Sequence, residues 1–115
     1  MPKEAYDLDS SVTPAMRDQL LQKLKTLPSA PGVYFHKDAK GEVIYVGKAA
    51  VLKNRVRQYF HHSPKDPKTT ALVREIADTD WLVVDTEMDA LFLESEMIKR
   101  YKPKWNILLR DDKTV

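Results

Sequence analysis

The residue whose position most strongly suggests chemistry is Glu94, in a segment whose apolar residues recur at helical spacing. Leu91, Ile98 and Tyr101 lie three, four and seven residues away, so Glu94 shares their predicted inward face. A carboxylate that loses its hydration must be paired with a cation, protonated or bound to a metal ion. One glutamate is enough for a magnesium site, because this ion keeps several of its waters. An ion pair with a lysine or arginine is the structural alternative.

Two tyrosines, Tyr34 and Tyr45, stand in neighbouring predicted strands, and Lys48 follows three residues after Tyr45. A phenol has a reference pKa of about 10, so it acts as a base near neutral pH only where positive charge favours its phenolate. Lys48 or a metal-bound water network could supply that charge. Packing within the sheet is the simpler role for either tyrosine taken alone.

A third group of residues could hold a phosphate. Arg55 and Tyr59 are four residues apart in a predicted helix and therefore share one face. A guanidinium can bind a phosphate through two hydrogen bonds and offset the charge that develops in phosphoryl transfer. Residues 47–50, expected as a strand-to-helix turn, are small enough for a phosphate to approach backbone N–H groups. Asn106 could cap a turn or donate to a phosphate, while a solvated arginine and a plain turn are the structural alternatives.

Positive charge is concentrated in one stretch of the sequence. Residues 46–74 contain seven basic residues and one acidic residue, although the whole chain carries a net charge of only +2. A polyanion could bind there, or the charges could simply form a solvated surface.

A small α/β fold would position these residues. Apolar spacing, capping residues and breakers predict four helices, over 14–26, 51–59, 69–77 and 87–101. Alternating apolar and aromatic residues predict three strands, over 32–35, 43–46 and 81–85. We therefore expect a three-stranded, mainly antiparallel sheet flanked by helices. A flexible leader over 1–12 precedes a single domain over 13–115.

Composition excludes several classes of protein. The chain has no cysteine, which rules out disulfides and thiolate metal sites. It has neither an apolar run of about 20 residues for a membrane span nor the apolar stretch of a signal peptide. His36, His61 and His62 do not have the spacing of a metal site. We expect a monomeric, cytoplasmic protein.

Several motifs, taken in order, resemble the GIY-YIG nuclease family. They are Gly-Val-Tyr at 32–34, Tyr-Val-Gly-Lys-Ala at 45–49, Leu-Lys-Asn-Arg-Val at 52–56, Tyr-Phe at 59–60 and the segment 94–106. The resemblance spans about 31–113, and its sequence variants look like those of the UvrC-type repair members. Valine replaces isoleucine in both tripeptides, and Trp105 stands where a tyrosine is common, which keeps an aromatic ring but removes a hydroxyl.

The resemblance implies the GIY-YIG fold and hydrolysis of one phosphodiester bond in damaged duplex DNA, 3′ to a lesion, during nucleotide excision repair. A UvrB-like partner would hand over the DNA. The implied ligand of a single Mg²⁺ or Mn²⁺ ion is Glu94. The implied catalytic residues are Tyr45 as general base, Tyr34 in support, Lys48, Arg55 on the phosphate, Tyr59 and Asn106.

The residues expected to contact DNA are Lys48, Lys53, Arg55, Arg57, Lys65 and Lys68. Two other functions stay open from sequence: a stand-alone nuclease or one-incision relative, and a non-catalytic DNA-binding module. Because a UvrC-type protein would continue beyond Val115, we also expect this chain to be a fragment of a longer protein.

Overall fold

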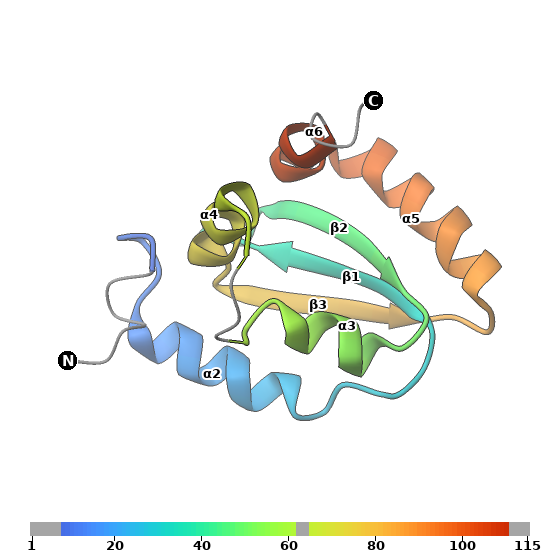
Figure 1. Ribbon diagram of the computed structural model, residues 1–115, viewed down its shortest axis with the longest axis horizontal. Coiled ribbons are helices and arrows are strands. Elements are labelled where there is room, and N and C mark those ends of the chain that lie inside the picture. The colour runs from blue at the N-terminus through green and yellow to red at the C-terminus, as the bar shows by residue number, and fades with distance from the viewer. Residues whose placement is uncertain (1–7, 62–64, 111–115) are drawn as a thin grey trace.

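A three-stranded antiparallel sheet in the order β2-β1-β3 forms the centre of the computed structural model, which describes residues 8–61 and 65–110 (Figure 1). The strands are β1 (Gly32–Lys37), β2 (Val43–Ala49) and β3 (Asp78–Val83). The helices are α2 (Pro14–Leu24), α3 (Leu52–Gln58), α4 (Pro67–Glu75), α5 (Glu87–Tyr101) and α6 (Lys104–Arg110). The predicted fold class, an antiparallel sheet flanked by helices, is confirmed.

Three helices begin at a polar side chain that caps them. The Thr13 hydroxyl accepts from the Met16 N–H before α2, the Asp66 carboxylate from the Thr69 N–H before α4, and the Thr86 hydroxyl from the Asp89 N–H before α5. At its other end, α5 stops at Lys102, whose backbone is left-handed with φ 47°.

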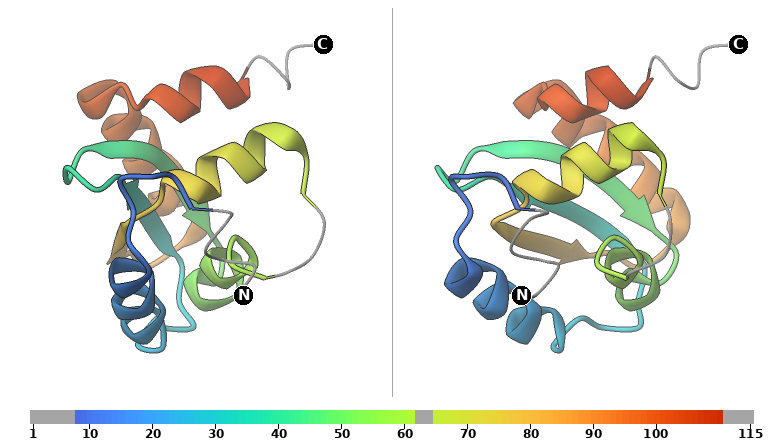
Figure 2. Two further views of the ribbon diagram at one scale, coloured as in Figure 1. Left: turned by 90° about the vertical axis from the view of Figure 1, so that its left-hand side faces the viewer. Right: turned by 60° about the vertical axis from the view of Figure 1, so that its left-hand side comes forward.

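Alternation along β1 sends its side chains to two different hydrophobic clusters. Val33 and Phe35 pack with Ala90 of α5 on one face of the sheet. Tyr34 packs on the opposite face, in a cluster whose buried members come from α2, α3, α4 and α6 as well. Figure 2 shows α6 beyond the β2 edge of the sheet, and α2 and α3 toward the β3 edge.

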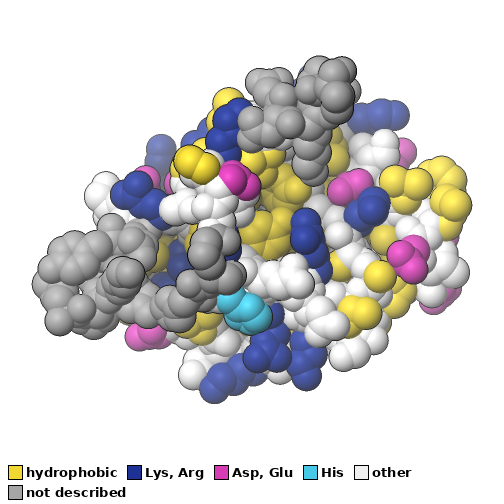
Figure 3. All heavy atoms as spheres, viewed as in Figure 1, with side chains coloured by type: hydrophobic (Ala, Val, Ile, Leu, Met, Phe, Trp, Pro, Cys, Tyr) yellow, Lys and Arg dark blue, Asp and Glu magenta, His cyan; other side chains and the backbone are white. Residues whose placement is uncertain are grey.

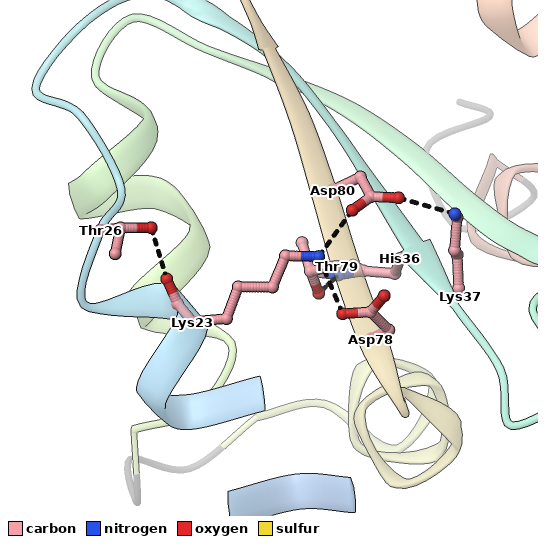
Figure 4. A network of polar contacts seen from close by, with 7 residues as sticks. All are labelled: Lys23, Thr26, His36, Lys37, Asp78, Thr79 and Asp80. Atoms are coloured by element: carbon pink, nitrogen blue, oxygen red, sulfur yellow. Dashed lines mark hydrogen bonds and ion pairs between the residues drawn. The ribbon is translucent and has the colours of Figure 1, made fainter. Parts of the chain in front are cut away.

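Ion pairs hold helix α2 against the outer edge of β3 (Figure 4). The Lys23 ammonium lies 3.1 Å from Asp78 and 2.6 Å from Asp80, and Lys37 contacts the other oxygen of Asp80 at 2.6 Å. Burial raises the pKa of Asp80, but the hydrogen bonds from Lys23 and Lys37 outweigh it and hold that pKa below its usual value. The network therefore positions α2 beside the sheet.

Several predicted elements differ from the observed ones: β1 extends to Lys37 rather than to residue 35, β3 ends at Val83 rather than at residue 85, and α4 covers Pro67–Glu75 rather than 69–77. Gly47 does not end the second strand, because β2 continues to Ala49 and pairs with residues 32–34 of β1. The third strand begins earlier than predicted, at Asp78, because its polar residues face charges on α2 and β1. Helix α6 was not predicted at all, since Pro103 was taken as the end of helical structure.

The predicted leader falls partly outside the described residues, which begin at residue 8. The rest contacts the fold, because the Asp9 N–H donates to the Arg74 carbonyl and Val12 is buried. Among the helices in 8–61 and 65–110, none combines the length and apolar character needed to cross a bilayer.

Candidate active site

Three tyrosines, from β1, from β2 and from the C-terminal cap of α3, meet on one face of the sheet. The hydroxyls of Tyr34 and Tyr59 are 2.7 Å apart, within hydrogen-bonding distance. The Tyr45 ring lies 6.3 Å from the Tyr34 ring and 6.4 Å from the Tyr59 ring, between centroids. Tyr34 is fully buried, whereas Tyr45 is partly exposed. The structure thus brings together the two predicted strand tyrosines and the predicted helix tyrosine.

Burial makes all three phenols harder to ionise than an exposed tyrosine. It raises the pKa of Tyr34 to about 12 and also raises the pKa of Tyr45 and of Tyr59. Arg55 opposes this rise, since its guanidinium lies 5.7 Å from the centroid of the Tyr59 ring. The pKa of Arg55 is itself raised, mainly because the negative charge that Tyr34 carries when ionised would stabilise the guanidinium. A phenolate at Tyr45 therefore requires positive charge beyond that of Arg55.

Glu94 and Tyr45 line the same pocket, at the open edge of β2. The pocket has a volume of about 390 Å³ and is lined by Tyr45, Glu94, Ile98, Lys102, Pro103, Asn106, Ile107 and Leu109. The half-buried Glu94 is close enough for its negative charge to contribute to the raised pKa of Tyr45. Because Mg²⁺ commonly takes only one or two carboxylates and keeps several waters, a pocket with a single carboxylate can hold this ion. No three His, Asp or Glu side chains within the described ranges form a fuller metal cage.

Asn106 joins α6 to the free edge of β2. Its Oδ1 accepts from the Val46 N–H at 2.8 Å, and its Nδ2 donates to the Val46 carbonyl at 2.8 Å. Both backbone groups of Val46 point away from β1, so the amide takes the place of a neighbouring strand. Sequence reasoning offered a turn cap or a phosphate donor. The structure adds a further role, since this docked amide closes one wall of the pocket that Tyr45 and Glu94 also line.

The remaining predicted site residues lie apart from the tyrosines. Lys48 is exposed and pairs with Val33, so strand alternation places it on the α5 side of β2. It continues the strand, and the predicted phosphate-binding turn over 47–50 is absent. Lys65 donates to the His61 carbonyl, and Lys68 donates to the Leu108 carbonyl of α6.

Sequence reasoning missed His36, which lies beneath the tyrosine cluster. Its ring centroid is 4.7 Å from that of Tyr59 and 6.2 Å from that of Tyr45, and the residue is fully buried. Its Nδ1 is 2.8 Å from the Thr79 hydroxyl. Burial lowers the pKa of His36 to about 3, so the ring is neutral. A strand extended to residue 37 would have placed His36 on the same face as Tyr34.

Known proteins share this sequence and arrangement. A family model described as the UvrC-like GIY-YIG domain matches residues 30–107. The UvrABC system protein C of Caldicellulosiruptor saccharolyticus is 57% identical over 94 residues, which is 82% of this chain and 16% of that protein. That of Thermoanaerobacter sp. (strain X514) is 56% identical over 93 residues, covering 80% of this chain and 15% of the relative. The chain thus spans about one sixth of the length of these curated relatives.

Solved structures agree with the sequence comparison. The GIY-YIG N-terminal endonuclease domain of UvrC from Thermotoga maritima, bound to magnesium as its catalytic divalent cation, superimposes with a TM-score of 0.67. It is 36% identical, and the match covers 82% of this chain and 98% of that domain. Three variants of that domain with a tyrosine changed to phenylalanine are also bound to the cation.

The fold is that of a GIY-YIG nuclease domain. More specifically, the chain belongs to the UvrC-like GIY-YIG family.

Proposed function

We propose that this chain is a divalent-cation-dependent DNA endonuclease domain that hydrolyses one phosphodiester bond 3′ to a lesion during nucleotide excision repair. One observation carries the proposal: Glu94 shares a pocket with Tyr45, and Tyr45 belongs to the tyrosine cluster that Arg55 contacts. A carboxylate that can hold a cation and a guanidinium that can hold a phosphate thus both act on the surroundings of Tyr45.

Glu94 would hold the cation, magnesium or manganese, in agreement with the magnesium bound by the Thermotoga maritima domain. When bound, such a cation neutralises phosphate charge and lowers the pKa of a coordinated water. The residues fit this group because the pocket offers a single carboxylate and room for water and phosphate oxygens.

The side chains around Glu94 would divide the remaining work. Arg55 would bind the phosphate that is cut and offset its developing negative charge. Tyr45, at the pocket wall, would accept a hydrogen bond from the attacking water and take its proton once cationic charge favours the phenolate. Tyr34 and Tyr59 would fix the position of Arg55 and Tyr45. Lys48 would contribute positive charge from the α5 side of the strand.

The substrate and partner belong to the same proposal. Similarity to UvrABC system proteins supports damaged duplex DNA as substrate and a UvrB-like protein as the partner that delivers it. Cytoplasmic location, a monomeric isolated domain and the domain limits 13–115 stay predictions.

The deciding experiment compares wild type with Glu94→Gln in nicking a damaged duplex preloaded with the partner protein, with and without Mn²⁺. Glu96→Gln, an exposed carboxylate on the same helix, is the matched control. We expect metal-dependent nicking by wild type and the control, and a loss of at least 100-fold in Glu94→Gln, which corresponds to about 2.7 kcal/mol. Wild-type rates in Glu94→Gln would refute the metal ligand. No nicking by folded wild type would favour the non-catalytic DNA-binding module.

A further inference from the structure

The basic residues of α3 lie on two opposite sides of the helix. Arg55 contacts the tyrosine cluster, whereas Lys53 and Arg57 are each two residues away and so point about 160° from it. A helix with its side chains is about 10–12 Å across. A phosphate bound at Arg55 is therefore out of reach of Lys53 and Arg57.

Lys53 and Arg57 instead line a groove between α3 and α2, with a volume of about 330 Å³. Lys25, just after α2, completes its cationic rim, and Leu21, Leu24 and Phe60 form an apolar floor. In Figure 3, Lys and Arg side chains gather along this edge of the molecule, over α2 and α3. Helix α2 lies outside the segment matched by the family model, which begins at residue 30.

The groove carries an uncompensated positive charge. No acidic residue lines it. None of Lys25, Lys53 and Arg57 forms an ion pair with any residue in 8–61 or 65–110. All three side chains are exposed. Three unpaired cations around an apolar floor suit the backbone of DNA, in which negatively charged phosphates alternate with sugars. Lysine and arginine contact the phosphates whatever the base sequence is.

We infer that the α2–α3 groove binds the backbone of duplex DNA at a phosphate other than the one that is cut. This inference rests on the proposed function and adds a second anchor to it. The groove contact is independent of base sequence and fixes how the duplex lies across α3, so that Arg55 meets the scissile phosphate. Lys25, contributed by α2, is as much a part of this anchor as Lys53 and Arg57.

The test uses the triple variant Lys25→Ala/Lys53→Ala/Arg57→Ala and a charge-matched control, Lys40→Ala/Lys99→Ala/Arg100→Ala. The control residues are exposed and do not line the groove. Binding of a fluorescent undamaged 30-base-pair duplex is measured from 50 to 200 mM salt. We expect the groove variant to bind at least tenfold more weakly, with a salt slope smaller by up to about 2.7, because each phosphate contact contributes about 0.9. The control should keep most of the wild-type slope.

Nicking separates this inference from the proposed function. In the partner-loaded assay, the groove variant should lose activity through KM, and Arg55→Ala through kcat. An unchanged salt slope in the groove variant would overturn the groove as a DNA anchor. So would a variant that binds polyglutamate, a polyanion without phosphates, more weakly but binds DNA as well as wild type does. If wild type and control bind DNA with the expected slopes and never nick it, the proposed nuclease function fails while the anchor stands.

Discussion

The ring of Tyr34 lies directly over the backbone of Gly47, its partner on the neighbouring strand. A Cβ atom at Gly47 would overlap both Cζ and Oη of Tyr34. Glycine is needed here because of this close approach, which lets the Tyr34 hydroxyl reach that of Tyr59.

Gly47→Ala should therefore displace the Tyr34 ring and break its hydrogen bond to Tyr59. We expect a loss of about 1–3 kcal/mol in the free energy of unfolding, measured by urea denaturation, together with loss of metal-dependent nicking. Gly41→Ala is the control, since nothing lies within 4 Å of its added methyl group. Its positive φ of 85° will cost stability, but nicking should continue. Nicking at the wild-type rate by Gly47→Ala would show that the ring position is unimportant.

The buried tyrosines should resist ionisation. The chain has five tyrosines, of which Tyr34, Tyr45 and Tyr59 have raised pKa values. In a spectrophotometric titration we expect these three to remain protonated at pH 11. Because their folded-state pKa values are raised above about 10, the stability they contribute is complete below that pH. It is lost as pH rises toward 12.

Addition of Mn²⁺ should lower the titration midpoint of one tyrosine if Tyr45 acts as a base near the cation. The shift should disappear in Tyr45→Phe and persist in Tyr101→Phe, which is an exposed tyrosine on α5. If Mn²⁺ leaves the titration midpoint of every tyrosine unchanged in wild type, this result would argue against Tyr45 as the base.

The buried His36 should make the folded protein less stable in mild acid. Its folded-state pKa is lowered to about 3, while the unfolded value is about 6.5. Below pH 6.5 the unfolded chain binds a proton that the folded protein excludes, so stability falls as pH decreases, by up to about 1.4 kcal/mol for each pH unit. Urea denaturation between pH 6.5 and 4.5 should show this slope.

The slope should vanish in His36→Phe/Thr79→Val, which removes both partners of the buried hydrogen bond. His61→Phe, at an exposed position, should retain it. An equal slope in the double variant would assign the acid sensitivity to other groups.

Asn106 should contribute to stability and to the site together. In Asn106→Asp, a carboxylate oxygen would face the Val46 carbonyl in place of the Nδ2 donor. We expect a loss of about 1–3 kcal/mol and faster hydrogen exchange at the Val46 amide, measured by NMR. Asn54→Asp, an exposed position on α3, serves as the stability control. Unchanged hydrogen exchange at the Val46 amide would contradict the conclusion that Asn106 holds this backbone.

Local signals were sufficient for two of the three helices that begin with a capping side chain, whereas the start of α4, capped by Asp66, was placed two residues too late. Thr13-Pro14 and Thr86 marked the starts of α2 and α5 correctly, since the cap depends only on nearby residues. Gly47 was misread because a glycine usually interrupts a strand, and its reason for being there, the Tyr34 ring, comes from another strand.

The same distinction holds for the site. Glu94 was singled out because it shares helical spacing with Leu91, Ile98 and Tyr101. The structure places it in the pocket beside Tyr45, although Leu91 and Tyr101 themselves are exposed and do not form a buried face. The positions of His36 and Lys25 matter because of contacts between segments that are distant in the sequence. Asn106 bonds to Val46 from α6, a helix that sequence reasoning missed because it took Pro103 as the end of helical structure. Such contacts leave no periodic trace in the sequence.

The amide of Asn106 also governs how this molecule meets copies of itself. An open strand edge can template the addition of a strand from another molecule and so begin aggregation. β2 is an edge strand, and at its middle the Val46 N–H and carbonyl are already occupied by a side chain of the same chain. A single asparagine thus denies an incoming strand the central hydrogen bonds of a continuous ladder, at the same edge where the pocket of Tyr45 and Glu94 lies.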